Sequence, residues 1–513
     1  MDEVEYKKAK EDWVTGHEGG SMWEIYSISF VLLNSFVLWS AAAKYTKIFD
    51  YASNNIISNF LLEYMFLIIP SLLSCTLLVD FAFYLNVILL ILTFVIINTS
   101  SMKSTSDEKK KKKNRWESDS DEEEIIELSI NEDKLDDKNL AGADSKSTEK
   151  INIDDIRRKP FLSAFRSSMM ILTCLSILAV DFPIFPRRLA KTETYGTSLM
   201  DLGVGSFVFS SGIVAARPFL KKPENRFKPL RGQLLRAVRQ ALPILILGFI
   251  RLMMVKGVDY QEHASEYGVH WNFFFTLGFL PIFVTICRTL HKYIRFSILG
   301  LSIAILYQIV LNRLGLEDYI LYAHRTDLIS SNKEGICSFW GYLSVFLVAL
   351  DIGHYILPVD PYYAIRQNRQ NKKKPKPQKL AMILFSWVIL LWLGFMLCIA
   401  LRIPVSRRIA NLSYVFWVIA SNTTFLLLFQ VAEITFLEEY WKNERNLPMI
   451  IEAVNSNGLA VFLLANLLTG LVNLSIRTLF VNDSLAGCIL AGYMFIIVVI
   501  AVWFNINNWK FKL

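Results

Sequence analysis

The chain has 513 residues, of which 53% are hydrophobic and only 19% are charged, and its mean hydropathy is +0.37. Soluble domains carry about 25% charged residues, so this composition excludes a soluble enzyme and predicts a protein embedded in the lipid bilayer. The formal net charge of +8 is typical of basic loops that mark membrane topology, and we expect no nucleic-acid partner.

Runs of mostly apolar residues recur along the chain. A run of about 20 such residues spans a bilayer as a helix, because hydrocarbon offers the backbone no hydrogen-bond partner outside the helix itself. The fold is therefore predicted to be all-α and polytopic. We expect about 13 transmembrane helices, at 23–43, 57–79, 81–97, 167–180, 197–216, 240–255, 271–287, 296–314, 336–357, 380–401, 413–437, 458–476 and 485–504.

Basic residues accumulate in loops on alternate turns of this pattern, and such loops are retained in the cytosol. They lie at 44–47, 109–113, 217–239, 288–295 and 372–379, and two more lysines follow the last helix at 510 and 512. With an odd number of helices, this arrangement predicts a lumenal N-terminus and a cytosolic C-terminus.

Residues 99–160 are polar, first basic at 109–115 and then acidic at 119–124 and 133–137, with almost no aromatic residues. This composition is typical of a disordered tether, which we favour over a nucleic-acid or lipid-binding patch. The chain then divides into three parts. They are a lumenal tail with helices one to three (1–98), a charged cytosolic linker (99–160), and a membrane domain of helices four to thirteen (161–513).

Ionisable residues near the membrane are informative, because each costs about 2.5–3.5 kcal/mol at membrane depth on insertion scales and is usually paired or functional. We expect them to gather on the lumenal side. They are Asp181, Arg187, Arg188, Lys191, Glu193 and Asp201 in one loop; Glu262, His263, Glu266, His270 and Asn272 in the next; Asn332, Lys333 and Glu334; Arg407 and Arg408; and residues 455–458, which open the twelfth helix.

Two interpretations of the loop 181–201 stay open from residue types alone. In the first, its three carboxylates neutralise its three cations in a structural network. In the second, the cations attract an anionic substrate such as a lipid phosphate, while a carboxylate accepts a hydroxyl proton.

The helix that follows this loop has a flank of small residues, Gly205, Ser206, Ser210, Ser211 and Gly212. Such a flank admits a neighbouring helix or an acyl chain, and helix packing is the commoner use. The six cysteines are scattered singly, without C-x-x-C spacing or a histidine partner, so we expect no metal site.

A resemblance to a known family rests on six sequence blocks. They are KEDWVTGHEGGS (10–21), ILAVDFPIFPRRLAKTETYGTSLMDLGVGSFVFSSG (177–212), YQEHASEYGVHWNFF (260–274), SNKEGICSFWGY (331–342), VSRRIANLSYVFWV (405–418) and VNSNGLAVFLLANLLTGLVN (454–473). In these blocks the chain resembles the fungal GPI-anchored wall transfer protein family, the inositol acyltransferases that act on glucosaminyl-phosphatidylinositol. The resemblance covers nearly the whole chain apart from residues 99–160.

The resemblance implies a thirteen-helix enzyme of the endoplasmic reticulum membrane, with 161–513 as its catalytic membrane domain. Such an enzyme transfers a fatty acyl group, usually palmitoyl, from acyl-CoA to the inositol ring of glucosaminyl-phosphatidylinositol, an early step of GPI-anchor biosynthesis. The family's essential acid and lysine map to Asp181 and Lys191. Its acyl chain is held among helices four to seven and twelve. No metal or bound cofactor is implied, and palmitoyl-CoA is a co-substrate.

Acyl transfer from a thioester to a ring hydroxyl requires a proton acceptor and a positive group near the carbonyl oxygen. We expect Asp181 to accept or orient the hydroxyl proton and Lys191 to stabilise the oxyanion or the substrate phosphate, with the two roles interchangeable at this stage. The basic stretch 217–239 is the nearest dense cluster for the CoA phosphates, although topology alone also explains it. The expected substrate-binding residues are Arg187, Arg188, Glu193, Asp201, His270 and Asn272, of which the two arginines would hold the inositol phosphate.

Three other functions compete with this one. A transporter would also place polar residues at depth, but the chain shows no internal repeat and no broken helices at matched positions. A histidine-centred membrane-bound O-acyltransferase would need a buried residue such as His354, which is predicted near the cytosolic end of its helix. A structural scaffold would tolerate Asp181→Ala with folding intact.

Overall fold

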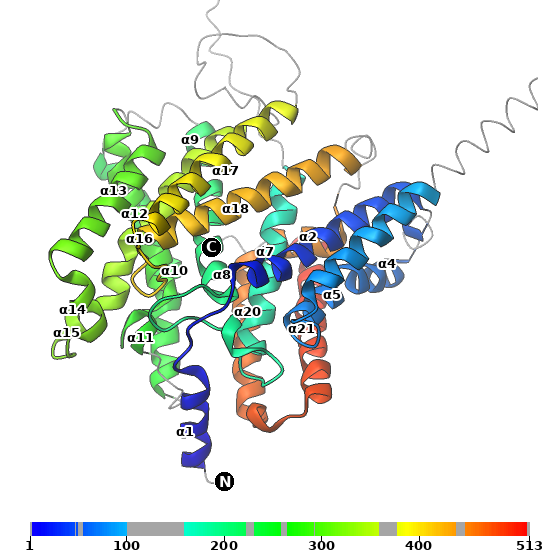
Figure 1. Cartoon of the computed structure of the whole chain (residues 1–513), viewed down its shortest axis with the longest axis horizontal. Coiled ribbons are helices and arrows are strands. Elements are labelled where there is room, and N and C mark those ends of the chain that lie inside the picture. The colour runs from blue at the N-terminus through cyan, green and yellow to red at the C-terminus, as the bar shows by residue number, and fades with distance from the viewer. Residues whose placement is uncertain are drawn as a thin grey trace, which may run out of the picture.

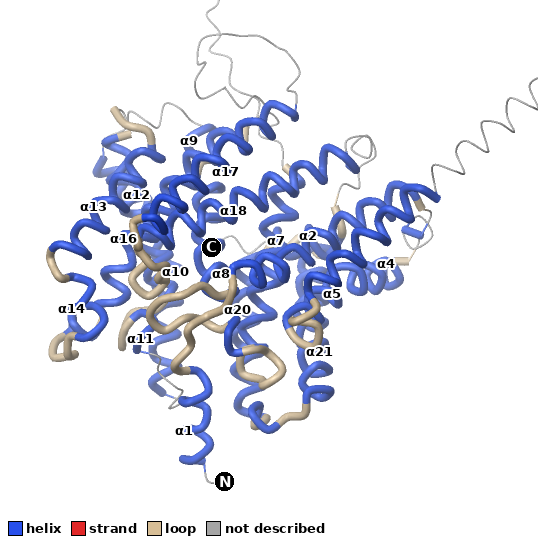
Figure 2. Tube along the Cα trace, in the orientation of Figure 1, coloured by secondary structure: helices blue, strands red, loops and turns tan. Residues whose placement is uncertain are grey.

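The computed structural model describes residues 3–46, 48–49, 55–99, 159–221, 230–257, 264–291, 293–358, 377–437 and 447–509. Within these ranges the chain is helical and has no strand (Figure 2), which confirms the all-α prediction. The linker predicted at 99–160 lies outside the described residues except at its ends. So do residues 262 and 263 and the lysines at 510 and 512.

Thirteen helices of the described part are long and apolar enough to cross a membrane, which confirms the predicted number. The first three are α2 (Met22–Tyr45); a continuous helix made of α4 (Ile56–Glu63), the π-helix η1 (Tyr64–Ile68) and α5 (Ile69–Cys75); and Ala82–Thr99. The next five are α7 (Pro160–Ala179), α8 (Leu199–Ala215) with its extension α9 (Arg217–Lys221), α10 (Leu230–Gly257), α12 (Phe273–Leu290) and α13 (Phe296–Arg313). The last five are α16 (Lys333–Ile356), α17 (Pro377–Ala400), α18 (Leu412–Ala432) with the π-helix η5 (Glu433–Leu437), α20 (Gly458–Ser475) and α21 (Asp483–Ile506).

Short helices lie before, between and beside these spans. They are α1 (Glu3–Val14), η3 (Arg187–Leu189), α11 (Ala264–Tyr267), α14 (Leu316–Tyr322), α15 (Leu328–Ser331), α19 (Met449–Ser456) and η7 (Thr478–Phe480). Figure 1 shows α1 extending beyond the ends of the long helices, on the same side as the connection between α20 and α21.

Two helices begin seven and ten residues before their predicted starts, because charged residues interrupt the hydropathy signal without interrupting the helix. α7 begins at Pro160 instead of 167, and Arg166 lies inside it. The Arg166 side chain donates to Ser210 Oγ at 3.0 Å and to Asn455 Oδ1 at 2.9 Å. α10 begins at Leu230 instead of 240, with three arginines in its first three turns. The long stem of an arginine side chain can lie along apolar surface while its charged head stays in water, so a helix can carry arginines where it enters the membrane.

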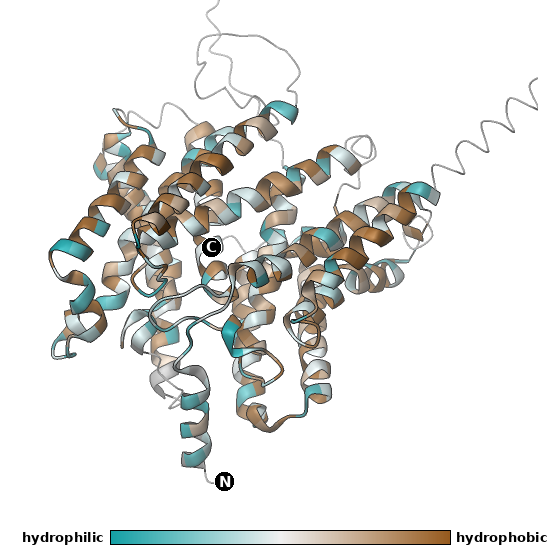
Figure 3. Ribbon diagram, viewed as in Figure 1, coloured by the Kyte–Doolittle hydropathy of each residue, from teal (hydrophilic) through white to brown (hydrophobic). Residues whose placement is uncertain are grey.

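The burial of the spans separates central helices from peripheral ones. In α16 and α7, 83% and 78% of the most apolar window is buried, whereas in α10 and α17 only 17% and 22% is buried. The exposed residues of the peripheral helices include many large apolar ones, such as Leu306 in α13 and Leu393 in α17, and Figure 3 colours much of both ribbons brown. An apolar surface of this kind fits a hydrocarbon solvent, so lipid is expected to cover it.

The small-residue flank of α8 packs against helices. A Cβ atom at Gly212 would lie 2.6 Å from the carbonyl oxygen of Phe346 in α16, and one at Gly205 would lie 2.5 Å from the Val418 side chain in α18. The commoner interpretation of this flank, a neighbouring helix, is therefore confirmed. The opposite side of α8 remains available to face a cavity.

Four of the five predicted lumenal clusters meet at one face of the bundle. Gly196 N donates to Val405 O at 2.9 Å, joining the loop before α8 to the loop before α18. Val269 N donates to Ser331 O at 2.9 Å, joining the segment before α12 to the end of α15, which directly precedes α16. The fifth cluster, 455–458, was placed wrongly, because Asn455 bonds to Ser163 and Arg166, at the opposite end of α7 from Asp181.

Candidate functional site

A cavity of about 720 Å³ opens beside the loop face of α7, α8, α10, α12 and α20. Its volume falls in the range of about 300–1,000 Å³ that is usual for small-molecule sites. Each of the five helices contributes apolar side chains, among them Leu172, Phe207, Leu247, Phe274 and Leu467. The polar lining comes from both loops and helices and includes Thr15, His17, Asp181, Lys191, Glu193, Glu266, Asn272 and Arg407.

Asp181 lies directly after the last turn of α7 and is 6% exposed. Its Oδ2 accepts a hydrogen bond from Asn473 Nδ2 at 2.8 Å, and its Oδ1 lies 3.5 Å from Lys10 Nζ. The turn at the end of α7 thus places a carboxylate on the cavity wall, where an amide from α20 and an ammonium group from α1 hold it.

Lys191 lies on the same cavity and has a different counter-ion. Its Nζ donates to both carboxylate oxygens of Glu266, each at 2.9 Å, and both side chains are between a quarter and a third exposed. Glu266 belongs to the short helix α11 and also lines the cavity. The ammonium group of Lys191 is therefore held at the cavity by a partner that leaves it partly open to a ligand.

The cavity brings together the two residues expected to be catalytic, but each is paired outside the loop 181–201. Neither Lys10 nor Glu266 belonged to the predicted site. Both lie in the sequence blocks that carry the family resemblance, and this location was the signal that could have suggested a role at the site. Their pairing spans 171 and 75 positions, and residue types do not reveal contacts over such separations.

Two of the six expected substrate-binding residues also border the cavity. Glu193 accepts a hydrogen bond from Gly16 N at 2.7 Å, which ties the loop to the N-terminal segment. Asn272 caps the N-terminus of α12 by accepting from Phe274 N at 3.0 Å and Phe275 N at 3.3 Å. Capping fixes the Asn272 side chain, so its position at the cavity follows from the start of the helix.

The arginines expected to hold a phosphate lie outside the cavity lining. Arg187 Nη2 donates to the carbonyl oxygens of Asp12 at 2.9 Å and Thr15 at 3.1 Å. Arg188 is paired with Glu24 at 2.8 Å and also with Asp80. The two guanidinium groups therefore attach the N-terminal segment and a neighbouring loop to the fold.

Asp201 is a fully buried anchor for the loops and does not line the cavity. Its Oδ1 accepts from Arg407 Nε at 2.6 Å, and its Oδ2 accepts from Thr192 N at 3.1 Å and Thr192 Oγ1 at 2.8 Å. Burial by itself lowers the pKa of the Arg407 guanidinium, but the carboxylates of Asp201 and Glu266 raise that pKa well above its ordinary value. Arg407 therefore stays a cation at the cavity wall.

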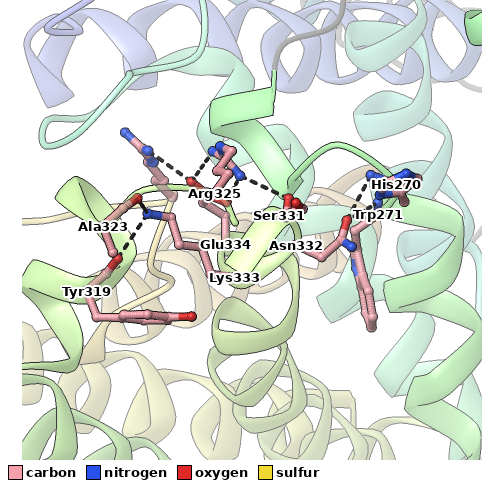
Figure 4. Close-up of polar contacts among 10 residues, drawn as sticks. His270, Trp271, Tyr319, Ala323, Arg325, Ser331, Asn332, Lys333 and Glu334 are labelled. Atoms are coloured by element: carbon pink, nitrogen blue, oxygen red, sulfur yellow. Dashed lines mark hydrogen bonds and ion pairs between the residues drawn. The ribbon is translucent and has the colours of Figure 1, made fainter. Parts of the chain in front are cut away.

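The connection between α11 and α12 is held by a polar network at the start of α16 (Figure 4). Asn332 Oδ1 accepts from the backbone nitrogens of His270 at 2.8 Å and Trp271 at 2.9 Å. The fully buried Glu334 accepts from Arg325 at 2.6 Å and from Arg408 at 3.0 Å. His270 thus joins the network through its backbone, and its side chain is not part of the cavity lining.

His354, the residue that a histidine-centred mechanism would need, is separate from the cavity. It lies in the last turn of α16, and its Nδ1 is 2.8 Å from Leu350 O. Its ring lies 6.1 Å from that of Phe296 and 5.9 Å from that of Phe219. These contacts give His354 a packing position away from Asp181 and Lys191.

The cavity combines a long apolar lining with a polar end that carries both signs of charge. This arrangement suits an amphipathic ligand whose apolar chain lies among the helices and whose reactive group lies between Asp181 and the Lys191–Glu266 pair. A carboxylate can take a proton there, and an ammonium group can stabilise a developing oxyanion.

Known proteins match this chain over nearly its whole length. The family model described as GWT1 matches residues 6–504. Proteins named GPI-anchored wall transfer protein 1 are similar to the chain, with 39% identity over an alignment of 541 residues in Gibberella zeae, covering 100% of each chain. The identity is 38% in Aspergillus oryzae, covering 99% of each chain, and 40% in Yarrowia lipolytica, covering 95% of each. The chain therefore belongs to the GWT1 family.

Proposed function

We propose that this protein transfers a fatty acyl group, palmitoyl for preference, from acyl-CoA to the inositol ring of glucosaminyl-phosphatidylinositol. This reaction is an early step of GPI-anchor biosynthesis in the endoplasmic reticulum membrane. Membership of the GWT1 family, whose relatives are named for the transfer of GPI-anchored wall proteins, supports a role in this pathway.

The observation that carries the proposal is a single cavity that joins an acid and an amine to an apolar lining from five helices. A fatty acyl chain matches the apolar part, and a polyol headgroup matches the polar end. Besides Lys191, the cavity lining includes the cations Arg251 and Arg407, and we assign the substrate phosphate to these two arginines in place of Arg187 and Arg188.

In the proposed reaction the inositol hydroxyl oxygen attacks the thioester carbonyl carbon. Asp181 accepts the hydroxyl proton as the new C–O bond forms, and Lys191 stabilises the negative charge on the carbonyl oxygen. The C–S bond then breaks, and Asp181 returns the proton to the leaving CoA thiolate. Glu266 keeps the Lys191 ammonium group at the cavity throughout these steps.

Alignment of the two substrates is expected to provide most of the rate. Holding both reactants in line can supply roughly 7–11 kcal/mol of the barrier. The helices lining the cavity fix the acyl chain, and the hydrogen bond from Asn473 together with the Lys10 contact fixes the Asp181 carboxylate. The protein therefore meets the reactants with its proton acceptor already oriented.

The test supplies the purified protein with labelled palmitoyl-CoA and glucosaminyl-phosphatidylinositol and measures acylated lipid. Asp181→Asn and Lys191→Ala are expected to fold and to lose most of the activity. Asp80→Asn is a matched control, because its carboxylate is 77% exposed and belongs to a peripheral pair. Parental rates in the folded Asp181 and Lys191 variants would refute the site, and no acylation by the parental protein would refute the function.

A further inference from the structure

The N-terminal segment packs directly against the loop that carries Asp181 and Lys191. Trp13 Nε1 donates to Val180 O at 3.3 Å, one residue before Asp181. The Trp13 ring also lies 4.9 Å from the Arg187 guanidinium. α1 is thus docked at the end of α7 through contacts that do not depend on any charge on Asp181.

The residues after α1 become part of the cavity wall. Glu193 N donates to His17 O at 3.0 Å, and Gly20 N donates to Thr197 O at 2.8 Å. Gly16, which lies between two cavity-lining residues, has a φ of +74°. Only glycine adopts this left-handed conformation without strain, so the turn at Gly16 directs Thr15 and His17 toward the cavity.

Lys10 contacts Asp181 from the buried side of α1. Its exposed fraction is only 8%. Lys10 Nζ donates to Asn473 Oδ1 at 2.7 Å and lies 3.5 Å from Asp181 Oδ1, while Asn473 Nδ2 donates to Asp181 Oδ2 at 2.8 Å. The ammonium, the amide and the carboxylate therefore form a closed triangle built from α1, α20 and the turn after α7.

Burying an ammonium group is costly unless it is paired. Trp13 already attaches α1 through its contacts with Val180 and Arg187. Attachment of the helix therefore does not by itself explain the position of Lys10. Its position instead favours the ionised form of Asp181, because an opposite charge within about 4–6 Å stabilises a carboxylate. The amide of Asn473 accepts from one group and donates to the other, which restricts rotation of the Asp181 side chain.

We propose that Lys10 is a positioning residue for the reaction, holding Asp181 as an oriented carboxylate at the cavity. Lys10 does not line the cavity itself, so it acts through Asp181 and not on the substrate. This inference rests on the proposed acyl transfer and extends the active site to the N-terminal segment.

The experiment compares Lys10→Gln with Lys10→Arg and Lys8→Met in the full-length protein. Glutamine keeps a donor toward Asn473 but removes the charge, whereas arginine keeps the charge. Lys8 is an exposed residue of the same helix and serves as the matched control. The measurements are kcat and KM for palmitoyl-CoA, the Kd of a non-hydrolysable palmitoyl-CoA thioether, and the apparent melting temperature.

Lys10→Gln is expected to lower kcat about 10- to 100-fold, the range typical when a residue that orients a metal ligand is replaced. The Kd of the thioether should stay at its parental value. Lys10→Arg should recover most of kcat, and Lys8→Met should match the parental protein. A role limited to folding would lower the melting temperature and the fraction of active protein without this recovery.

The proposal is overturned if Lys10→Gln keeps the parental kcat, or if its loss matches a drop in stability and Lys10→Arg recovers nothing. Should Lys10→Gln fail to fold, Asn473→Leu removes the amide link while retaining the ammonium group. That variant is expected to lower kcat with unchanged thioether binding, and parental kcat would then count against the proposal. If the parental protein itself is inactive, the proposed function is refuted. The Lys10 and Asn473 variants test only the positioning role, because their kcat is compared with that of an active parental protein.

Discussion

Replacing Asp201 with asparagine tests whether this carboxylate supports the fold or binds substrate. Asp201 accepts three hydrogen bonds, one from Arg407 at 2.6 Å and two from Thr192 at 2.8 and 3.1 Å. Asparagine preserves the shape of the side chain but removes the charge opposite a guanidinium that is 2% exposed. Removing one partner of a buried ion pair costs about 3–5 kcal/mol.

Arg407 cannot avoid this cost by losing its proton, because an arginine is not deprotonated at neutral pH. Glu266 also raises the pKa of Arg407 and remains in the variant, although burial opposes this effect. The remaining carboxylate compensates part of the guanidinium charge. We therefore expect a loss near the lower end of the range, about 3 kcal/mol.

The assay heats detergent-solubilised protein in steps and records the temperature at which half of the monodisperse gel-filtration peak is lost. Irreversible unfolding makes this temperature depend on rate, so every variant needs the same heating schedule. Asp201→Asn should melt several degrees below the parental protein. Asp80→Asn should melt at the same temperature as the parental protein, because exposed pairs contribute about 0–1 kcal/mol. Adding Arg407→Gln to Asp201→Asn should restore part of the loss, since it removes the uncompensated charge.

A contrary result would make Asp201 a substrate ligand, as its place in the loop first suggested. That result is parental melting of Asp201→Asn together with a raised KM for the glycolipid acceptor. A fall in kcat alone, at parental stability, would also contradict the structural role.

Three further outcomes are expected. Glu266→Gln should lower kcat about tenfold, a loss of about 1.4 kcal/mol for a partly exposed charged pair, and parental steady-state kinetics would contradict its role in holding the lysine. Gly212→Ala should destabilise the protein by about 1–3 kcal/mol, because its Cβ would lie 2.6 Å from a backbone oxygen of α16, whereas Gly492→Ala meets no atom within 4 Å and should melt like the parent. A glycosylation tag inserted in 110–150 should remain unmodified on a gel, and modification would invert the predicted orientation.

The number of spans was predictable because lipid imposes one rule on every segment that crosses it. The boundaries failed where arginines entered a helix, as at Arg166, since a hydropathy window counts the charge and not the hydrogen bonds that satisfy it. Residues 455–458 were misplaced for a different reason. They precede the twelfth helix, which begins on the cytosolic side in the predicted topology, so that topology already separated them from the lumenal clusters. Their hydrogen bonds to residues near the start of α7, which is helix four, agree with it.

Residue types predicted several residues of the candidate site, but they did not predict which residues form ion pairs with each other. Asp181 and Lys191 do share a cavity, as expected. Charge neutralisation within the loop does not occur as residue types suggested, because Asp201 pairs with Arg407 and Lys191 with Glu266. Asp201 does belong to a structural network, although its ionic partner comes from another loop, and the interpretation of the loop as a substrate site stays a prediction. Partner choice depends on which distant loops the helices bring together, and local sequence does not encode that.

The contact between Lys10 and Asn473 joins positions 463 residues apart, and this has a consequence for biosynthesis. During translation the acid after α7 is inserted long before the helix that supplies its amide neighbour. A nascent chain stalled before α20 would lack both that neighbour and one wall of the cavity. If the protein has the proposed activity, turnover begins only when the ribosome has almost finished, and prematurely terminated products should be inert even when their early helices are correctly inserted.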